Sequence, residues 1–169
     1  MSDAHGVIQI HSCSPALAQH VAWTLSSALG VPVRPFWSDQ PAESGTVRAE
    51  VEWSGEHGTA ARLASAMLGW ADLRFEITED TATGRDGVRY VHTPSLGIFY
   101  TLIDAAGNAM VNEDRVRYAM GIADGDITEL ERELRLALGT AWDDELEPYR
   151  AAQFADVVPL TREIGRAHV

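Results

Sequence analysis

The amino-acid sequence predicts an α+β fold in which two helices cover one face of an antiparallel sheet. Short segments in which apolar and polar residues alternate indicate strands with one buried face. Between them lie two stretches with apolar residues at every third or fourth position, which indicates helices. Along residues 6–80 these segments follow in the order β-α-β-β-α-β, which is the ferredoxin-like arrangement.

A strand over residues 6–12 and a helix over residues 14–30 form the first unit. In the strand, isoleucines alternate with polar residues, so that one face is apolar. In the helix, leucine or valine recurs every four residues and makes one apolar stripe. The helix limits are marked by an N-cap serine, a proline at the first helical position and a terminal glycine: Ser14, Pro15 and Gly30.

The remaining elements of the first half follow the same patterns. Strands are expected over residues 31–38, 46–53 and 73–80, and a second helix over residues 58–70. Two prolines suit the segment 31–38 to a sheet edge. In the expected strand order 4-1-3-2, the apolar strand faces meet the two helices. These core positions are Ile8, Ile10, Val47, Val51, Trp53, Leu73, Phe75 and Ile77.

Residues 88–150 are expected to extend this half by a β-hairpin and to end in helices. The hairpin turn lies at Gly107 and Asn108, two residue types that tolerate positive φ. A short helix follows over residues 113–121, and a last short helix ends near residue 150.

The helix between these two has the clearest limits. Asp126 is its expected N-cap, Glu129 completes a capping box, and Gly139 ends it. Its apolar residues form one stripe along the helix, and such a stripe normally faces a protein core. They are Ile127, Leu130, Leu134 and Leu138.

The elements together make one α+β domain over residues 1–150. Residues 6–80 are its ferredoxin-like half, and residues 88–150 are the hairpin and helices that extend it. The tail over residues 151–169 shows no periodic pattern and is expected to be loosely ordered. With 46% apolar residues and five tryptophans, the chain has enough material for a core.

The charge composition excludes several kinds of chemistry. The formal net charge is −12, and all thirteen basic residues are arginines. Without lysine the chain cannot form a Schiff base, attach pyridoxal phosphate or supply a P-loop lysine. An acidic surface repels phosphate backbones, so nucleic acid is not expected as a partner.

The sequence shows no pattern typical of export, membrane insertion or metal binding. The N-terminus has no basic region followed by a long apolar stretch, and no window approaches the roughly 20 apolar residues of a membrane helix. The six histidines and the single cysteine show no metal-binding spacing, and one cysteine forms no internal disulfide. We therefore expect a cytoplasmic protein without a cofactor, a metal ion or a membrane partner.

Four segments of the chain carry a family resemblance. They read IHSCSPALAQHVAWTLSSALG, ARLASAMLGWADLRFEITED, YVHTPSLGIF and LGTAWDDELEPYR. These segments resemble an actinobacterial family known as domain of unknown function 3145, and the similarity covers about residues 6–150. The resemblance implies no activity, cofactor or catalytic residues. It does imply a genomic neighbourhood of genes for fatty-acid synthesis.

Two histidines are candidate catalytic residues. His11 stands two residues before Cys13, whose place at a helix N-terminus favours the thiolate. The alternative is a plain helix cap in which the cysteine fills space. His92 lies in a polar turn with Thr93 and Ser95, whose hydroxyl groups also suit bonds to the local backbone.

The sheet face away from the two helices is the third candidate site. It would carry Gln9, His11, Arg48, Glu50, Glu52, Arg74 and Glu76. Its arginines suit an anionic ligand, and Glu76 would orient His11 for acid–base chemistry. The candidate ligand-binding residues are Gln9, Arg48, Arg74, Thr93 and Ser95. The simpler interpretation is a solvated lattice of opposite charges, worth about 0.2–1 kcal/mol per pair, unless residues 88–150 cover this face.

Three functions remain open at this point. The one we expect is a non-catalytic binding or regulatory protein with a protein or small anionic ligand as partner. Its proline-rich sheet edge and an exposed Trp37 would serve partner contact or dimerisation. The second is a small enzyme with His11 or His92 as proton carrier and Glu76 or Glu50 orienting it, which requires these side chains to converge in one cleft. The third is an anion sensor that uses the arginines of the sheet.

Overall fold

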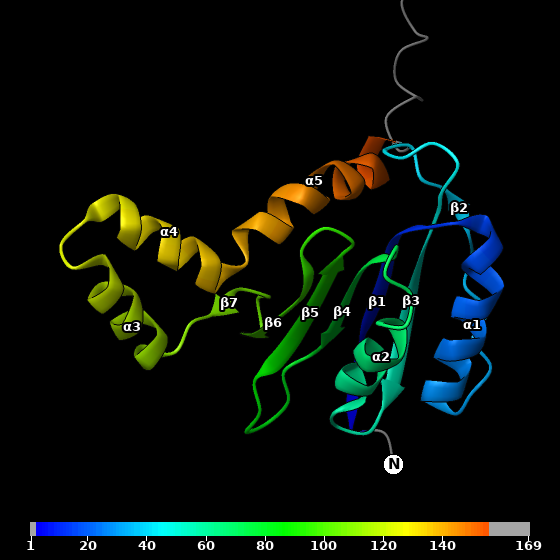
Figure 1. Ribbon diagram of the computed structural model, residues 1–169. Coiled ribbons are helices and arrows are strands. Elements are labelled where there is room, and N and C mark those ends of the chain that lie inside the picture. The colour runs from blue at the N-terminus through cyan, green and yellow to red at the C-terminus, as the bar shows by residue number, and fades with distance from the viewer. Residues whose placement is uncertain (1–2, 156–169) are drawn as a thin grey trace, which may run out of the picture.

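A computed structural model describes residues 3–155. Over this range the chain forms an α+β fold with a seven-stranded antiparallel sheet and five helices (Figure 1). The strands lie in the order β2-β3-β1-β4-β5-β6-β7. They are β1 (Ala4–Cys13), β2 (Ser38–Asp39), β3 (Val47–Gly55), β4 (Arg74–Glu79), β5 (Gly87–Thr93), β6 (Gly97–Ile103) and β7 (Ala109–Met110). The helices are α1 (Pro15–Leu29), α2 (Thr59–Met67), α3 (Glu113–Ala123), α4 (Ile127–Leu138) and α5 (Thr140–Ala155).

The first four strands carry the core. β1 lies between β3 and β4 and pairs antiparallel with both, as the expected strand order requires. Ile8 lies opposite Val51 on one side and Ile77 on the other, so the apolar residues of three strands share one face. Side chains of α1 and α2 pack on that face. The predicted core is confirmed, because six of its eight residues are buried and Val47 and Val51 are partly buried against them.

The limits of α1 agree with the sequence. Ser14 Oγ accepts a hydrogen bond from the N–H of Ala16 at 3.3 Å. Pro15 stands at the first helical position, where a backbone N–H has no partner within the helix. Gly30 ends the helix with a φ of 70°, in the left-handed region that glycine adopts without strain.

The segment 31–38 is not the full-length strand expected, although it leads into β2 at the sheet edge that its prolines indicate. Only Ser38 and Asp39 pair, as β2, with the beginning of β3. The prolines of this segment lack the N–H that a strand ladder needs, which explains the short pairing. Trp37 is half-buried and packs on the core, so it is not the exposed contact residue expected from the sequence. Its neighbour Phe36 is the exposed one, at 86%.

The sequence predicts one β-hairpin after the first half, whereas the sheet continues beyond β4 with three antiparallel strands. β5 pairs with β4, β6 pairs with β5, and β7 pairs with β6. In the predicted turn, Gly107 has a φ of 84°. The carboxylate of Asp104 accepts hydrogen bonds from the N–H groups of Ala106 and Asn108, both at 2.9 Å, which closes the turn.

The helices after the sheet divide into two groups. α3 and α4 pack against each other and project away from the sheet, whereas α5 turns back across it (Figure 1). α5 is longer than the sequence predicts, because it continues past residue 150 to Ala155. The rest of the predicted loose tail, residues 156–169, lies outside the described residues.

The predicted capping box of α4 is only half formed. The carboxylate of Asp126 accepts hydrogen bonds from the N–H groups of Thr128 at 2.9 Å and Glu129 at 3.3 Å. The second hydrogen bond of a capping box would run from the N–H of Asp126 to the Glu129 carboxylate. That carboxylate instead accepts from Arg132 at 3.0 Å. The N–H of Asp126 donates instead to the carbonyl of Ala123 at 2.9 Å.

Candidate functional site

A bulge in β1 separates the side chains of His11 and Cys13. The pairing of β1 with both neighbours is regular up to Ile10 and shifts before Ser12 and Cys13. A bulge adds one residue to a strand and thereby interrupts the alternation of its faces. Cys13 consequently joins the core beneath the helices, while His11 contacts Glu76 on the opposite face. The structure does not bring the imidazole and the thiol together.

Cys13 is a buried thiol. Its side chain is in the core cluster, and its Sγ donates to the carbonyl oxygen of Ser14 at 3.2 Å. Burial raises the pKa of the Cys13 thiol to about 11, because the thiolate would lose its hydration. The neutral thiol therefore dominates near pH 7, in agreement with the space-filling interpretation.

His11 meets a residue of α5 that the sequence interpretation missed. Its Nε2 lies 2.5 Å from Oε2 of Glu76. Arg150 of α5 donates from Nε to the same oxygen at 3.0 Å and from Nη2 to the other oxygen. Arg150 also binds Asp143, two turns earlier on its helix, at 3.1 Å. His11 is 1% exposed and Glu76 is 5% exposed. α5 therefore covers this part of the polar sheet face, and the sequence alone did not decide whether that face is covered.

Glu76 is held in its charged form by this arrangement. Burial alone would raise the pKa of Glu76, but hydrogen bonds and charges from His11 and Arg150 outweigh it and lower the pKa to about 2. His11 and Glu76 thus have the geometry of an acid–base pair. Both oxygens of the carboxylate, however, already accept hydrogen bonds from this chain.

A second group of contacts ties α5 to the same face. Arg74 of β4 binds the carboxylate of Glu43 at 2.9 Å. The Arg74 guanidinium lies 4.8 Å from the ring centre of Tyr149, which belongs to α5. The Tyr149 hydroxyl donates to the same Glu43 carboxylate at 3.1 Å. Glu43, Arg74 and Tyr149 therefore form one closed group of contacts.

Glu145 of α5 holds the turn between β5 and β6. Thr93 Oγ1 and Ser95 Oγ donate to its carboxylate at 3.1 and 2.6 Å. Thr93 Oγ1 also accepts from the N–H of Leu96 at 3.2 Å, the local backbone bond that the turn interpretation predicts. We call the whole set of contacts the α5–sheet network. It comprises His11, Glu43, Arg74, Glu76, Thr93, Ser95, Asp143, Glu145, Tyr149 and Arg150.

His92 lies on the other face of the sheet. It pairs with Phe75 across the strands, and the two rings stack with their centroids 5.2 Å apart. His92 Nδ1 donates to the carbonyl oxygen of Leu73 at 2.7 Å. Because Phe75 belongs to the core beneath the helices, His92 faces away from His11. An acid–base site that needs both histidines is not assembled.

The other candidate residues of the polar face have separate partners. Gln9 donates to the carboxylate of Glu50 at 3.3 Å, and Arg48 Nε donates to the hydroxyl of Ser38 at 3.4 Å. Arg48 lies on β3 and Arg74 on β4, with β1 between them. The contacts given for the two arginines are with different groups.

The N-terminus of α2 is an anion site that the chain fills itself. The Glu79 carboxylate accepts hydrogen bonds from the N–H of Gly58 at 3.1 Å and of Ala60 at 3.2 Å. His57 Nδ1 lies 2.7 Å from the same carboxylate. The sequence interpretation missed Glu79, although strand alternation places it on the apolar face, where a carboxylate needs partners.

Within residues 3–155, no group of three or more His, Cys, Asp or Glu side chains is placed to hold a metal ion. None of the helices described is both long and apolar enough to cross a membrane.

α3 and α4, which we call the helical arm (residues 113–138), carry apolar side chains on their outside. Six of the fourteen large apolar side chains exposed in the described part of the chain lie on it. They are Tyr118, Met120, Ile122, Ile127, Leu136 and Leu138. Ile127 heads the stripe that the sequence assigns to a core, yet it is 80% exposed, and Glu133 is the buried residue of α4. α3 covers that stripe only in part.

The charges of the arm are unevenly balanced. Each of its four arginines pairs with a glutamate: Arg115 with Glu133, Arg117 with Glu113, Arg132 with Glu129, and Arg135 with Glu131. Asp114, Asp124 and Asp126 have no ion-pair partner among the described residues. Two of these three aspartates flank the turn between the helices, so the surplus negative charge lies mainly at that end.

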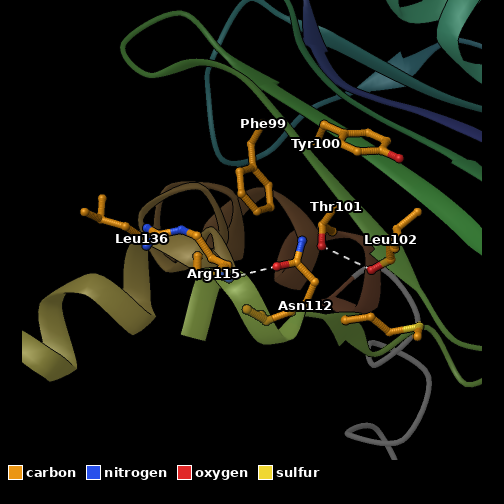
Figure 2. A pocket seen from close by; sticks show the side chains of 10 residues that line it. Phe99, Tyr100, Thr101, Leu102, Asn112, Arg115 and Leu136 are labelled. Carbon is orange, nitrogen blue, oxygen red and sulfur yellow. Dashed lines mark hydrogen bonds between the residues drawn. The ribbon is translucent and has the colours of Figure 1, made fainter. Parts of the chain in front are cut away.

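A hollow of about 340 Å³ opens at the base of the arm, between β6, β7, α3 and α4. Figure 2 shows hydrogen bonds between residues that line it. Asn112 Oδ1 accepts from the N–H of Arg115 at 2.8 Å, and Thr101 Oγ1 donates to the carbonyl of Leu102 at 3.1 Å. Nη1 of Arg115 is buried without a hydrogen-bond partner among the described residues, while most of the lining is apolar.

The sequence profile of a family described as "Protein of unknown function (DUF3145)" matches residues 7–162. The chain belongs to this family. The match confirms the resemblance found in the sequence, and in this DUF3145 protein both the α5–sheet network and the helical arm lie inside the matched region. No curated protein and no solved structure shows significant similarity to the chain.

One glycine joins the helical arm to α5 in this DUF3145 chain. Gly139, between α4 and α5, has a φ of 69°, and a Cβ there would lie 2.4 Å from a ring carbon of Phe99. The Phe99 ring stacks on Trp142 of α5, with centroids 5.1 Å apart. Trp142 Nε1 in turn donates to the carbonyl of Gly97 at 3.0 Å. This packing fixes the direction in which the arm leaves the sheet.

Proposed function

We propose that this DUF3145 protein is a non-catalytic binding protein that attaches to a protein partner through its helical arm. The observation that carries the proposal is the exposed apolar side of α4, on helices that project from the sheet (Figure 1). Contiguous exposed apolar patches mark interaction sites on soluble proteins. The α5–sheet network supports the same conclusion, because the residues best suited to catalysis are occupied by one another.

A protein partner fits this surface better than a small molecule does. Small-molecule sites are concave and surround most of the ligand, with a few polar groups aimed at it. The arm is a projecting pair of helices, and the hollow at its base is lined mainly by apolar side chains. Helix faces of this kind dock through apolar anchor residues instead.

The rest of the molecule acts as a scaffold in this proposal. Strands β1 to β4 with α1 and α2 would be the ferredoxin-like half that the sequence predicts, and α5 anchors the arm to it through the α5–sheet network. The chain would work in the cytoplasm as an accessory protein. Its catalytic alternative required His11 and His92 to converge, and they lie on opposite faces of the sheet.

Site-specific photo-crosslinking tests the proposal. A photoreactive amino acid replaces Met120 on the arm or, as a matched control, Trp23 on α1, since these two side chains are 59% and 60% exposed. Each variant of the full chain is produced in cells of the native host and irradiated. We expect one defined protein adduct from position 120, its loss when Ile127→Ser is added, and no such adduct from position 23.

The adduct supports the proposal only when the purified partner also binds the purified chain and Ile127→Ser weakens that binding. Equal adducts from both positions, or none from either, would contradict the proposal. So would turnover of an ester, thioester or phosphate substrate that His11→Ala or His92→Ala abolishes. If the partner belongs to fatty-acid synthesis, the genomic neighbourhood implied by the family resemblance gains support.

A further inference from the structure

We infer that the partner's receiving surface is an apolar groove edged by lysine or arginine, and that the tip of the arm inserts into it. This inference rests on the proposed function and specifies the chemistry of the partner. The tip is the turn between α3 and α4 with its two flanking isoleucines: Ile122, Asp124, Gly125, Asp126 and Ile127.

The apolar part of the tip consists of two isoleucines. Ile122 is 48% exposed and Ile127 is 80% exposed, although both are large aliphatic side chains. Ala123, next to Ile122, is buried, and α3 packs against α4. We call the two isoleucines the knob, and an apolar recess on a partner would remove its surface from water.

The polar part of the tip consists of two carboxylates. Asp124 and Asp126 flank Gly125 and have no ion-pair partner among the described residues. The arginines of the arm do not balance them, because each one is paired with a glutamate. The knob therefore sits in a negative potential, and complementary positive charge on the rim of the groove would speed association and select the partner.

Other occupants of the tip fit these charges less well. A second copy of this chain also carries a net charge of −12, and a symmetric contact at the tip would bring its own aspartates opposite Asp124 and Asp126. Nucleic acid and anionic lipid surfaces are repelled by the same carboxylates. A basic groove on another protein is the occupant that satisfies both the isoleucines and the aspartates.

Two synthetic probes test the chemistry directly. They are fluorescein-labelled amphipathic helical peptides of equal length with the same leucine stripe, one with lysine and one with glutamate at every polar position. Each is titrated with the full chain at physiological salt and followed by fluorescence anisotropy. We expect the lysine peptide to bind at least ten times more tightly than the glutamate peptide.

Variants of the tip distinguish binding at this site from non-specific attraction between the basic peptide and the acidic chain. Ile122→Ser combined with Ile127→Ser keeps the net charge and should weaken lysine-peptide binding at least ten-fold. Asp124→Asn combined with Asp126→Asn should weaken it to a similar degree, and asparagine preserves the helix cap at position 126. As a control, Glu50→Gln combined with Glu52→Gln makes the same charge change on β3 and should alter binding less than two-fold.

The inference is overturned if the control variant weakens binding as much as the tip variants, or if the isoleucine variant binds normally. It is also overturned if sedimentation shows a dimer that Ile127→Ser dissociates, since the occupant is then a second copy. When crosslinking at Met120 succeeds but the peptides bind equally, the proposed function stands and the basic groove is wrong. When crosslinking fails as well, the proposed function itself is wrong.

Discussion

α4 and α5 follow each other directly in the chain, yet they bury opposite kinds of side chain. α5 lies on the sheet, buries Leu146 completely and binds Glu76 through Arg150. α4 packs mainly on one other helix, exposes most of Ile127 and buries the carboxylate of Glu133. An amphipathic pattern therefore shows which side of a helix is apolar, but not whether anything covers that side.

The largest expected effect compares one substitution on the two helices. Leu146→Ala should lower the free energy of unfolding by about 3 kcal/mol, because it opens a cavity at a site that is 0% exposed. Leu138→Ala should lower it by less than about 1 kcal/mol, since that leucine is already 42% exposed. Urea unfolding followed by tryptophan fluorescence measures both. Equal losses would show that the arm is packed as tightly as α5.

The second prediction concerns the ion pair that holds α5. Glu76→Gln should lower the free energy of unfolding by about 3 kcal/mol, because the partly buried Arg150 guanidinium loses the more deeply buried of its two carboxylate partners and keeps only Asp143. The matched control is Glu52→Gln, an exposed carboxylate of the same sheet, which should change stability by less than about 0.5 kcal/mol. If both variants unfold at the same urea concentration, the α5–sheet network does not hold the helix.

The third and smallest expected effect is the pH dependence of the stabilisation that Glu76 provides. The pKa of Glu76 is about 2 in the folded chain against an ordinary 4.5, so its stabilisation is present above about pH 4.5 and is lost as pH falls towards 2. The difference in unfolding free energy between the native chain and Glu76→Gln should shrink by about 2 kcal/mol from pH 7 to pH 3. Urea titrations at several pH values measure it, and a constant difference would mean that Glu76 has an ordinary pKa.

Local signals in the sequence predicted the first half of the fold well. Ser14, Pro15 and Gly30 define α1 through contacts within a few residues, and strand alternation placed Ile8 and Phe75 in the core. The segment 31–38 was predicted only in part: β2 lies at the sheet edge that the prolines indicate, but these prolines restrict the pairing to Ser38 and Asp39.

The candidate site depended on contacts that local signals do not contain. The bulge that separates His11 from Cys13 is visible only in the pairing of β1 with its neighbours. The position of α5 over Glu76 joins residues 74 positions apart. The sequence did contain one signal for this contact. Asp143 and Arg150 stand seven residues apart, which places them on one side of a helix, and there they form a hydrogen bond.

The close packing of Gly139 on Phe99 has a consequence for the kinetics of recognition. The joint has little room to move, so in the proposed function the arm would reach a partner already in its final orientation. Association then costs less conformational entropy than the folding of a flexible segment would, and binding resembles rigid-body docking. A partner that fits the tip should capture it at a rate set by diffusion and orientation rather than by a slow rearrangement of this chain.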